Sequence, residues 1–399
     1  MQYLISLFGL LVMMFLAWLI SADRKKMNLR LIISGVVLQF IFAFIVLKTG
    51  PGQMFFEGAR YAVAKVVSCS DAGAEFVFGK EFREHYFAFS VLPTIIFVAS
   101  IMAVLFHLGI MQHIVKGIAK IMVRVMDTSG SESLATAANV FIGQTEAPLV
   151  IKPYLETMTR SEIMAMMTGG MATVAGGVMA AYASMGADAG HLLAASIMSA
   201  PAALVIAKII IPEKEESQTK GVVKVIIPKQ DTNILEAACR GASDGLKLAL
   251  NVAAMLIAFI AIVYLINGLL TFLPGVGGQP ISLERILGWI CAPLAWIMGV
   301  EWKEANLIGM VIGKKIVLNE FVAYIDLIKI KDTVSERSFI IATYALCGFA
   351  NFSSIAIQIG GIGSLVPSRR KDFAKLGLRA MIGGTLAAFM TAAIASMLI

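Results

Sequence analysis

Polar residues interrupt an apolar part of the chain at Asn139–Pro148, which reads Asn-Val-Phe-Ile-Gly-Gln-Thr-Glu-Ala-Pro. The apolar runs on either side, 134–142 and 149–155, are too short to cross a bilayer, which takes about 20 residues. Non-helical backbone and ionisable groups persist at membrane depth only where protein buries them or they line a cavity. We therefore expect a re-entrant hairpin whose tip forms a binding site. The candidate residues at this tip are Gly143, Gln144, Thr145 and Glu146.

A second apolar region, 303–330, is interrupted by Lys314, Lys315, Asn319 and Glu320. A carboxylate at the centre of a bilayer costs at least about 2.5 kcal/mol on insertion scales. Glu320, like its counterpart in the first interruption, is therefore a strong candidate for ligand binding. The two lysines are expected to be structural, either by snorkelling or by neutralising a carboxylate of the hairpin.

The composition is that of an integral membrane protein whose solvent is lipid. Hydrophobic residues make up 58% of the 399 residues, charged residues 15%, and the mean hydropathy is +0.83. The net charge of +7 requires no nucleic acid, because membrane proteins concentrate Lys and Arg in cytoplasmic loops. The four cysteines form no C-x-x-C motif and are expected to be reduced packing residues. Residues 1–22 lack a basic n-region and are expected to form a span, not a signal peptide.

The predicted fold is an all-α polytopic membrane protein. Eight spans are expected, at about 2–22, 31–47, 87–111, 163–185, 191–211, 248–272, 338–366 and after the basic loop 368–375. Residues 49–86 are expected outside the membrane or at its interface, and a polar helix near 232–246 leads into span six. Interfacial helices are predicted at 112–126 and 286–298. The distribution of Lys and Arg predicts that both termini are extracytoplasmic.

The order of these elements recurs along the chain. From span three it is span, interfacial helix, broken hairpin, span and span, and the same order begins again at span six. Three spans separate the hairpins, so they enter the membrane from opposite faces. Inverted repeats with discontinuous helices that meet near the midplane are typical of secondary transporters. The alternative is a chance similarity among helices rich in Gly and Ala.

Residues 313–324 read Gly-Lys-Lys-Ile-Val-Leu-Asn-Glu-Phe-Val-Ala-Tyr. This segment fits the G-x-K-x-x-x-N-E-F-V-A-Y signature of the concentrative nucleoside transporters. Residues 143–146 and the Gly-Phe-Ala-Asn-Phe-Ser-Ser segment at 348–354 also resemble that family. The resemblance extends over essentially the whole chain, in the eight-span bacterial form.

The resemblance implies a nucleoside site with two ends. The base end falls to Gly143, Gln144, Thr145 and Glu146, with Val178 of span four touching the base. The ribose end falls to Glu320, Asn351 and Ser354, with Phe349 as an apolar wall. A Gln offers a donor and an acceptor to a base edge, and a carboxylate suits two vicinal hydroxyls. Read without the family, the polar side chains within the helices could instead tie helices together.

The resemblance also implies a sodium site formed by Asn139, Ile142, Thr173 and Val174. The two polar side chains would supply oxygens, and Ile142 and Val174 would supply carbonyls freed where the helix breaks. Relatives often have Ser where this chain has Thr173. Some bacterial members use protons, so a proton-coupled symporter remains an alternative to a sodium-coupled one.

The expected function is ion-driven nucleoside uptake at the bacterial cytoplasmic (inner) membrane, with elevator-like alternating access. The resemblance implies a homotrimer on spans three and six and a transport part that moves against this scaffold. The scaffold comprises 1–126 and 212–300, and the transport part 127–211 and 301–399. Free nucleobases are an alternative cargo, which the ribose residues disfavour. An intramembrane enzyme is disfavoured because no H-E-x-x-H motif or histidine cluster is present, so no catalytic residue is assigned.

Overall fold

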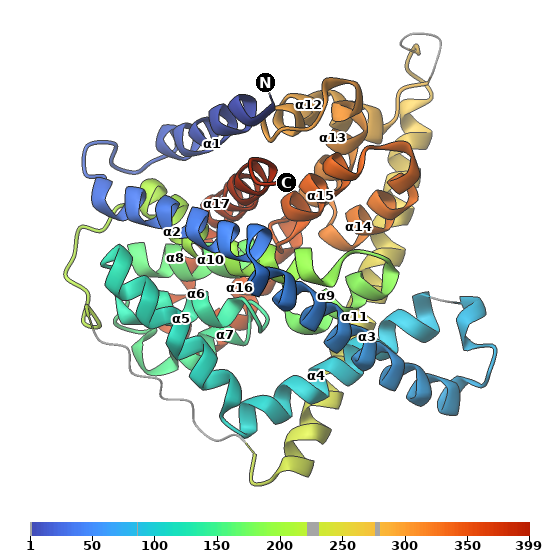
Figure 1. Cartoon of the computed structure of the whole chain (residues 1–399), viewed down its shortest axis with the longest axis horizontal. Coiled ribbons are helices and arrows are strands. Elements are labelled where there is room, and N and C mark those ends of the chain that lie inside the picture. The colour runs from blue at the N-terminus through green and yellow to red at the C-terminus, as the bar shows by residue number, and fades with distance from the viewer. Residues whose placement is uncertain (1, 86, 222–230, 276–279) are drawn as a thin grey trace.

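The computed structural model describes residues 2–85, 87–221, 231–275 and 280–399, and within these ranges its regular elements are all helices (Figure 1). One isolated bridge joins Ser129 to Lys220. The long unbroken helices are α1 (Gln2–Leu19), α2 (Leu29–Lys48), α3 (Gly50–Phe78), α4 (Leu92–His107), α10 (Ala189–Ile210), α11 (Ile234–Leu270) and α17 (Arg370–Ser396). Short turns of helix lie at η1 (Phe82–His85), η2 (Phe87–Val91), η3 (Lys152–Tyr154), η4 (Lys331–Thr333) and η5 (Pro367–Arg369). The all-helical prediction is confirmed.

Two of the predicted spans are broken near their middle. Span four consists of α8 (Arg160–Ala172) and α9 (Gly176–Met185), and span seven of α15 (Glu336–Leu346) and α16 (Phe352–Leu365). By length and composition, seven helices of the described residues can cross a membrane, or up to eight if one bent pair counts as a span. Span seven is not among the seven because its break divides it into two short helices.

The two hairpin regions are also discontinuous helices. The first consists of α6 (Gly130–Asn139) and α7 (Ala147–Val150), and the second of α13 (Trp302–Val317) and α14 (Glu320–Lys329). In both halves of the chain, the first turn of the hairpin is hydrogen-bonded to the first turn of the broken span that follows. Ser131 Oγ donates to Glu162 at 2.9 Å, and Ser335 Oγ donates to Glu304 at 2.8 Å. This shared pattern supports the repeat, whose inverted orientation remains a prediction.

The predicted interfacial helices lie beside these hairpins. Helix α5 (Ile110–Met126) buries Val115, Ala119 and Met122 and exposes its basic residues, as the amphipathic pattern predicts. Helix α12 (Leu283–Ile297) turns by 118° into α13. These two helices pack closely, because a Cβ at Gly309 would lie 2.7 Å from the amide nitrogen of Ala292.

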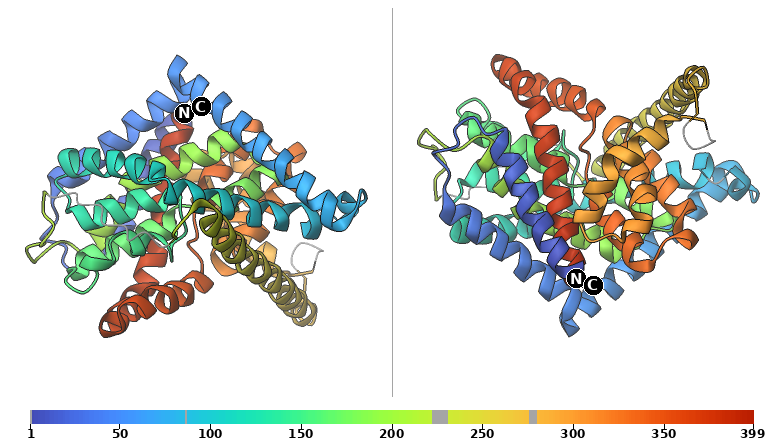
Figure 2. Two further views of the ribbon diagram at one scale, coloured as in Figure 1. Left: turned by 90° about the horizontal axis from the view of Figure 1, so that it is seen from below. Right: turned by 90° about the horizontal axis from the view of Figure 1, so that it is seen from above.

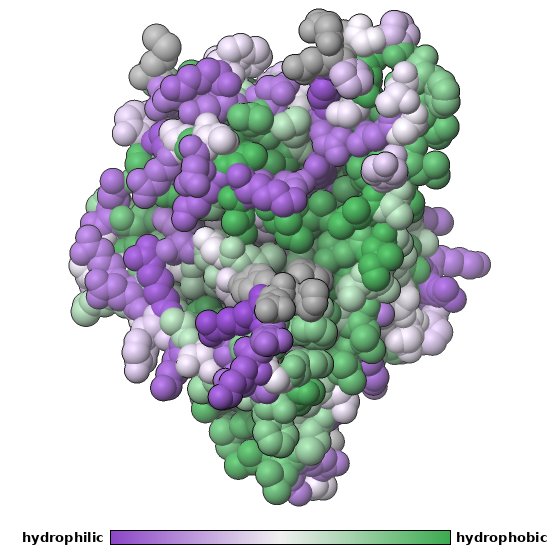
Figure 3. All heavy atoms as spheres, turned by 90° about the vertical axis from the view of Figure 1, so that its right-hand side faces the viewer, coloured by the Kyte–Doolittle hydropathy of each residue, from purple (hydrophilic) through white to green (hydrophobic). Residues whose placement is uncertain are grey.

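The sequence divided 232–272 into a polar helix and a span, but α11 is one continuous helix of 37 residues. Its first turns are polar, with Arg240 and Asp244, and the helix continues through them because Gly241 and Gly245 pack closely on α4. The side of the molecule on which α11 lies in Figure 1 has broad apolar areas, shown in Figure 3. Leu250, Ile257 and Ile260 of α11 are exposed, as expected for a helix that faces lipid or another apolar partner.

Helices α8 and α10 and the C-terminal two thirds of α17 form the buried centre of the fold. The red ribbon of α17 runs between its neighbours in both views of Figure 2, and the chain termini lie side by side. Arg337 holds the C-terminal end by donating to the carbonyls of Ser396 and Ile399 at 2.6 and 2.8 Å. Adjacent termini agree with an even number of crossings, and their extracytoplasmic location remains a prediction.

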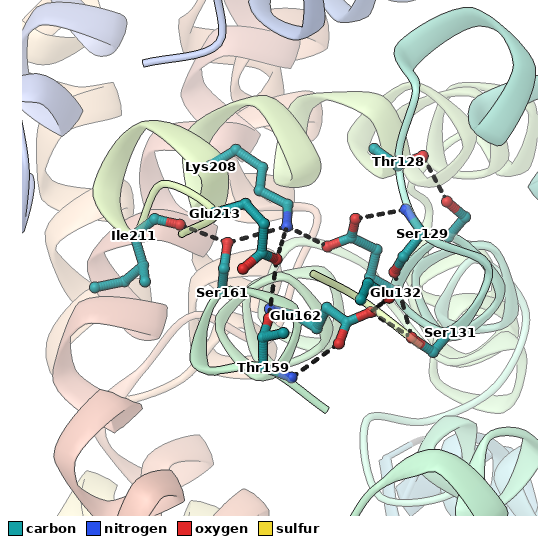
Figure 4. A network of polar contacts seen from close by, with 12 residues as sticks. Thr128, Ser129, Ser131, Glu132, Thr159, Ser161, Glu162, Lys208, Ile211 and Glu213 are labelled. Atoms are coloured by element: carbon teal, nitrogen blue, oxygen red, sulfur yellow. Dashed lines mark hydrogen bonds and ion pairs between the residues drawn. The ribbon is translucent and has the colours of Figure 1, made fainter. Parts of the chain in front are cut away.

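A buried polar network ties the base of the first hairpin to α8 and α10 (Figure 4). Lys208 of α10 pairs with Glu132 at 2.7 Å and with Glu213 at 3.1 Å, and it donates to Ser161 at 3.0 Å. Ser131 is buried in the same network. Ser129 and Glu132, on either side of Ser131, form the capping box of α6. These polar residues therefore begin a buried helix.

We predict that Lys208→Met lowers stability, because it leaves two carboxylates without their buried cation. Breaking one partner of a buried pair costs about 3–5 kcal/mol. Thermal unfolding in detergent, followed by circular dichroism, measures this. Lys214→Met is the matched control, since Lys214 pairs with Asp23 at the surface. Equal melting temperatures for the two variants would contradict a central role for the network, and adding Glu132→Gln to Lys208→Met should restore part of the loss.

Opposed hairpins predict opposite accessibility of their bases. Glu156 lies at the base of the first hairpin and Lys303 at the base of the second, and both are exposed. In a background without native cysteines, a membrane-impermeant thiol reagent should label Lys303→Cys in intact cells and spare Glu156→Cys. Inside-out vesicles should give the reverse. Labelling of both from one side would show that the hairpins enter from the same face.

Candidate functional site

The tip of the first hairpin is a tight reversal of the chain after α6. The carbonyl of Gly143 accepts hydrogen bonds from the amides of Glu146 and Ala147, each at 3.0 Å. The carboxylate of Glu146 accepts from the amide of Gly143 at 3.3 Å. The turn therefore satisfies much of its own backbone, as non-helical chain at membrane depth must.

The break in span four lies against this tip. The amide of Gly176, at the start of α9, donates to the carbonyl of Phe141 at 3.0 Å. This contact brings the break at 173–175 beside Asn139 and Ile142, so the four predicted sodium ligands come from two adjoining breaks in helix. The hydroxyl of Thr173 donates to Gly169 at 2.8 Å, which leaves its oxygen able to accept.

The oxygens at this junction fit a small hard cation. Asn139 is buried, and its Oδ1 has no hydrogen-bond partner among the described residues. Within the same described ranges, no hydrogen bond reaches the carbonyls of Ile142 and Val174. Freed carbonyls and a side-chain oxygen at broken helices are the donor set that coordinates Na⁺ in transporters.

The second centre lies at the start of α14. Glu320 is buried, and its carboxylate accepts from the Tyr182 hydroxyl at 3.1 Å and from Asn351 Nδ2 at 2.8 Å. Asn319 caps α14 by accepting from the amide of Val322 at 2.9 Å. The helix N-terminus also favours the negative charge of Glu320.

A chain of hydrogen bonds joins this centre to the first hairpin. Asn351 caps α16, because its Oδ1 accepts from the amide of Ser354 at 2.9 Å. Ser354 Oγ in turn accepts from Gln144 Nε2 at 3.1 Å. The structure thus brings together Gln144, Ser354, Asn351 and Glu320, which the sequence assigned to the two ends of one ligand.

The other predicted site residues differ in how deeply they are buried. Val178 is buried on α9, Phe349 is half-buried in the break of span seven, and Thr145 lies against Gly361 of α16. Glu146 is exposed. It lines a cavity of about 640 Å³ with residues of α4, α5 and α11. The two carboxylates predicted to share a ligand therefore have different surroundings in this conformation.

Two residues of the site were not predicted from the sequence. Tyr182 follows Val178 by four residues, and Gln358 follows Ser354 by four, so each shares a helix face with a predicted residue. That spacing was the available signal. The lysines of the signature have the expected structural roles. Lys314 pairs with Asp326 of the same hairpin at 2.6 Å, and buried Lys315 donates to the carbonyl of Ala345 at 2.8 Å.

Known protein families account for nearly the whole sequence. Residues 8–81 match the Na⁺ dependent nucleoside transporter N-terminus, 88–189 match a gate described as nucleoside recognition, and 191–396 match the Na⁺ dependent nucleoside transporter C-terminus. The uncharacterized transporter YutK of Bacillus subtilis is 44% identical over the full length of both chains. Solute carrier family 28 member 3 of Eptatretus stoutii is 42% identical, and sodium/nucleoside cotransporter 1 of Rattus norvegicus is 41% identical.

This chain aligns over 99% and 100% of its own length with these two vertebrate proteins but spans 60% and 64% of theirs. Among solved structures, CNTnw in an inward-facing substrate-bound state is 40% identical, with a TM-score of 0.94. An outward-facing variant of CNTnw gives the same two values. Each comparison covers 100% of this chain and 98% of the other. The chain belongs to the Na⁺-dependent, concentrative nucleoside transporter family, which consists of transporters and not of enzymes.

Proposed function

We propose that this protein is a secondary active symporter that takes up nucleosides at the bacterial cytoplasmic membrane, driven by Na⁺. The observation that carries the proposal is the series of hydrogen bonds from Gln144 of the first hairpin through Ser354 and Asn351 of span seven to Glu320 of the second hairpin. In the part of the chain that the structure describes, Asn139 Oδ1 of the first hairpin has no hydrogen-bond partner and remains free for an ion. The relative with the name sodium/nucleoside cotransporter 1 and the matching family description support the substrate class and the ion.

In this proposal the nucleoside bridges the two ends of the chain. Gln144 Nε2 donates one of its two hydrogens to Ser354 and can donate the other to the edge of a base. Gly143, Thr145 and Glu146 complete the base end, with Val178 as its apolar contact. Glu320 has two oxygens, and Tyr182 and Asn351 occupy only part of their capacity. The remaining capacity suits the vicinal hydroxyls of ribose, with Phe349 as a wall.

Sodium is the favoured coupling ion because its proposed ligands are neutral oxygens. Asn139, Ile142, Thr173 and Val174 contain no group that would exchange a proton at ordinary pH. A proton-coupled symporter is the alternative, and Glu146 would then be the exposed carboxylate to examine. A free nucleobase is a weaker candidate for the cargo, because it would leave Glu320 and Asn351 without ligand partners.

Transport would proceed by an elevator-like movement of the transport part, 127–211 and 301–399, against the scaffold, 1–126 and 212–300. The apolar outer residues of α11 and its packing on α4 favour these helices as the centre of a homotrimer. For example, a Cβ at Gly245 of α11 would lie 2.7 Å from the Cα of Ile96 of α4. Such close contact makes the pair a rigid element on which subunits can assemble.

We predict that Glu320→Gln reduces nucleoside uptake at least roughly tenfold, since a hydrogen bond to a charged group contributes about 1.5–3 kcal/mol. Uptake of labelled uridine and adenosine into proteoliposomes measures this. Transport of 2′,3′-dideoxynucleosides should change much less, because they lack the hydroxyls that the carboxylate binds. Glu156→Gln removes a carboxylate at the exposed hairpin base and should transport normally. Full uptake by correctly inserted Glu320→Gln would refute the ribose assignment.

We expect Thr173→Val to raise the sodium concentration for half-maximal uptake and to leave transport at saturating sodium largely intact. The substitution is nearly isosteric and deletes one proposed oxygen ligand. Thr385→Val is the matched control, because Thr385 makes the same type of bond to the carbonyl four residues earlier. Wild-type uptake that ignores sodium and follows a proton gradient would instead assign the driving ion to H⁺.

A further inference from the structure

Gln358 is a fully buried side chain on α16 that touches the proposed base-binding residue. Its Nε2 donates to Gln144 Oε1 at 3.0 Å and to the main-chain carbonyl of Met167 at 3.0 Å. A carbonyl can only accept, so the contact with Met167 fixes which end of the Gln358 amide is the nitrogen. The second hydrogen of that nitrogen then points to Gln144.

The orientation of Gln144 follows from this contact. Because Gln358 donates, Gln144 must turn its oxygen toward Gln358 and its nitrogen toward Ser354, to which it donates at 3.1 Å. The backbone of α8 thus sets the direction of the Gln144 amide through one intermediate side chain. Without that anchor, the hydroxyl of Ser354 could accept or donate and would hold either orientation.

The two amides are closely packed against α8. A Cβ at Gly170 of α8 would lie 2.9 Å from Gln358 Nε2 and 2.9 Å from Gln144 Cβ, so glycine is required where the two glutamines pass. Gln358 Oε1 has no hydrogen-bond partner among the described residues. The bonds that its nitrogen donates are therefore what hold the side chain in place.

We propose that Gln358 is a positioning residue for base discrimination, which fixes the order in which Gln144 presents its donor and acceptor to the base. This inference rests on the proposed nucleoside transport. Uracil carries an N–H beside a carbonyl, whereas cytosine carries a ring nitrogen acceptor beside an amino group, so the two edges have opposite order. Hypoxanthine and adenine differ in the same way. A fixed amide distinguishes the members of each pair, and a free amide can flip to suit both.

The test is the ratio of kcat/KM for uridine and cytidine, and for inosine and adenosine, in proteoliposomes. Wild type should favour one member of a transported pair by about fivefold, which corresponds to one hydrogen bond of about 1 kcal/mol. Gln358→Met should bring that ratio close to one, because methionine is of similar size and cannot donate. In a Gln144→Leu background the same substitution should no longer change the ratio.

Gln39→Met is the matched control. Gln39 is also fully buried, and its Nε2 donates to Thr391 at 2.8 Å, away from the base-binding residues. This variant should keep the wild-type ratio even if its rate falls. The inference is overturned if wild type does not distinguish either pair, or if Gln358→Met slows both members equally. Absence of uptake of every nucleoside by wild type would instead refute the proposed function itself.

Discussion

Helix ends inside a membrane must be capped by the protein, because the bilayer core has no water to satisfy their backbone groups. This chain has such ends at 139–147, 173–176, 318–320 and 347–352, where helices stop and start again. A nearby group satisfies part of each end: the carbonyl of Phe141 accepts from the amide of Gly176, Asn319 caps α14, and Asn351 caps α16. The broken fold depends on these caps.

The same caps hold the residues of the proposed binding site. Asn351 uses its oxygen to cap α16, which leaves its nitrogen to donate to Glu320. Ser354, whose amide is capped, turns its hydroxyl toward Gln144. At the other junction, where Gly176 bonds to Phe141, the side-chain oxygen of Asn139 has no partner within the described ranges. A residue that closes a helix end here also fixes a group for ligand, so structural and binding roles cannot be separated at these positions. A substitution there should affect folding and transport together, which is why the matched controls lie elsewhere.

Much of the architecture could be predicted from the sequence, because length and polarity report directly on membrane crossing. The interruptions at 143–146 and 314–320, the interfacial helix α5 and the paired order of elements all follow from where polar residues fall. The break in span seven was missed because its apolar flanks look continuous, although Gly348 at positive φ and the N-cap Asn351 form the break in the structure. The polar residues before span six suggested a separate helix there, but they belong to the same continuous helix, α11. Burial of Ser131 depends on Glu162 and Thr219, which are remote in sequence.

Only those residues of the candidate site whose type alone indicates a binding role could be predicted from the sequence. Glu320, Asn351 and Gln144 can be identified from the sequence because a polar group within an apolar membrane segment costs free energy. Tyr182 and Gln358 act through what they touch, and those contacts join segments that are 138 and 214 residues apart. A local sequence pattern does not reveal contacts between segments so far apart in the chain. In the proposed site, Glu320 binds the ribose of any nucleoside, whereas the direction of the Gln144 amide, set from α8 through Gln358, selects the base. Specificity in that proposal depends most on a residue whose role comes from a contact remote in sequence.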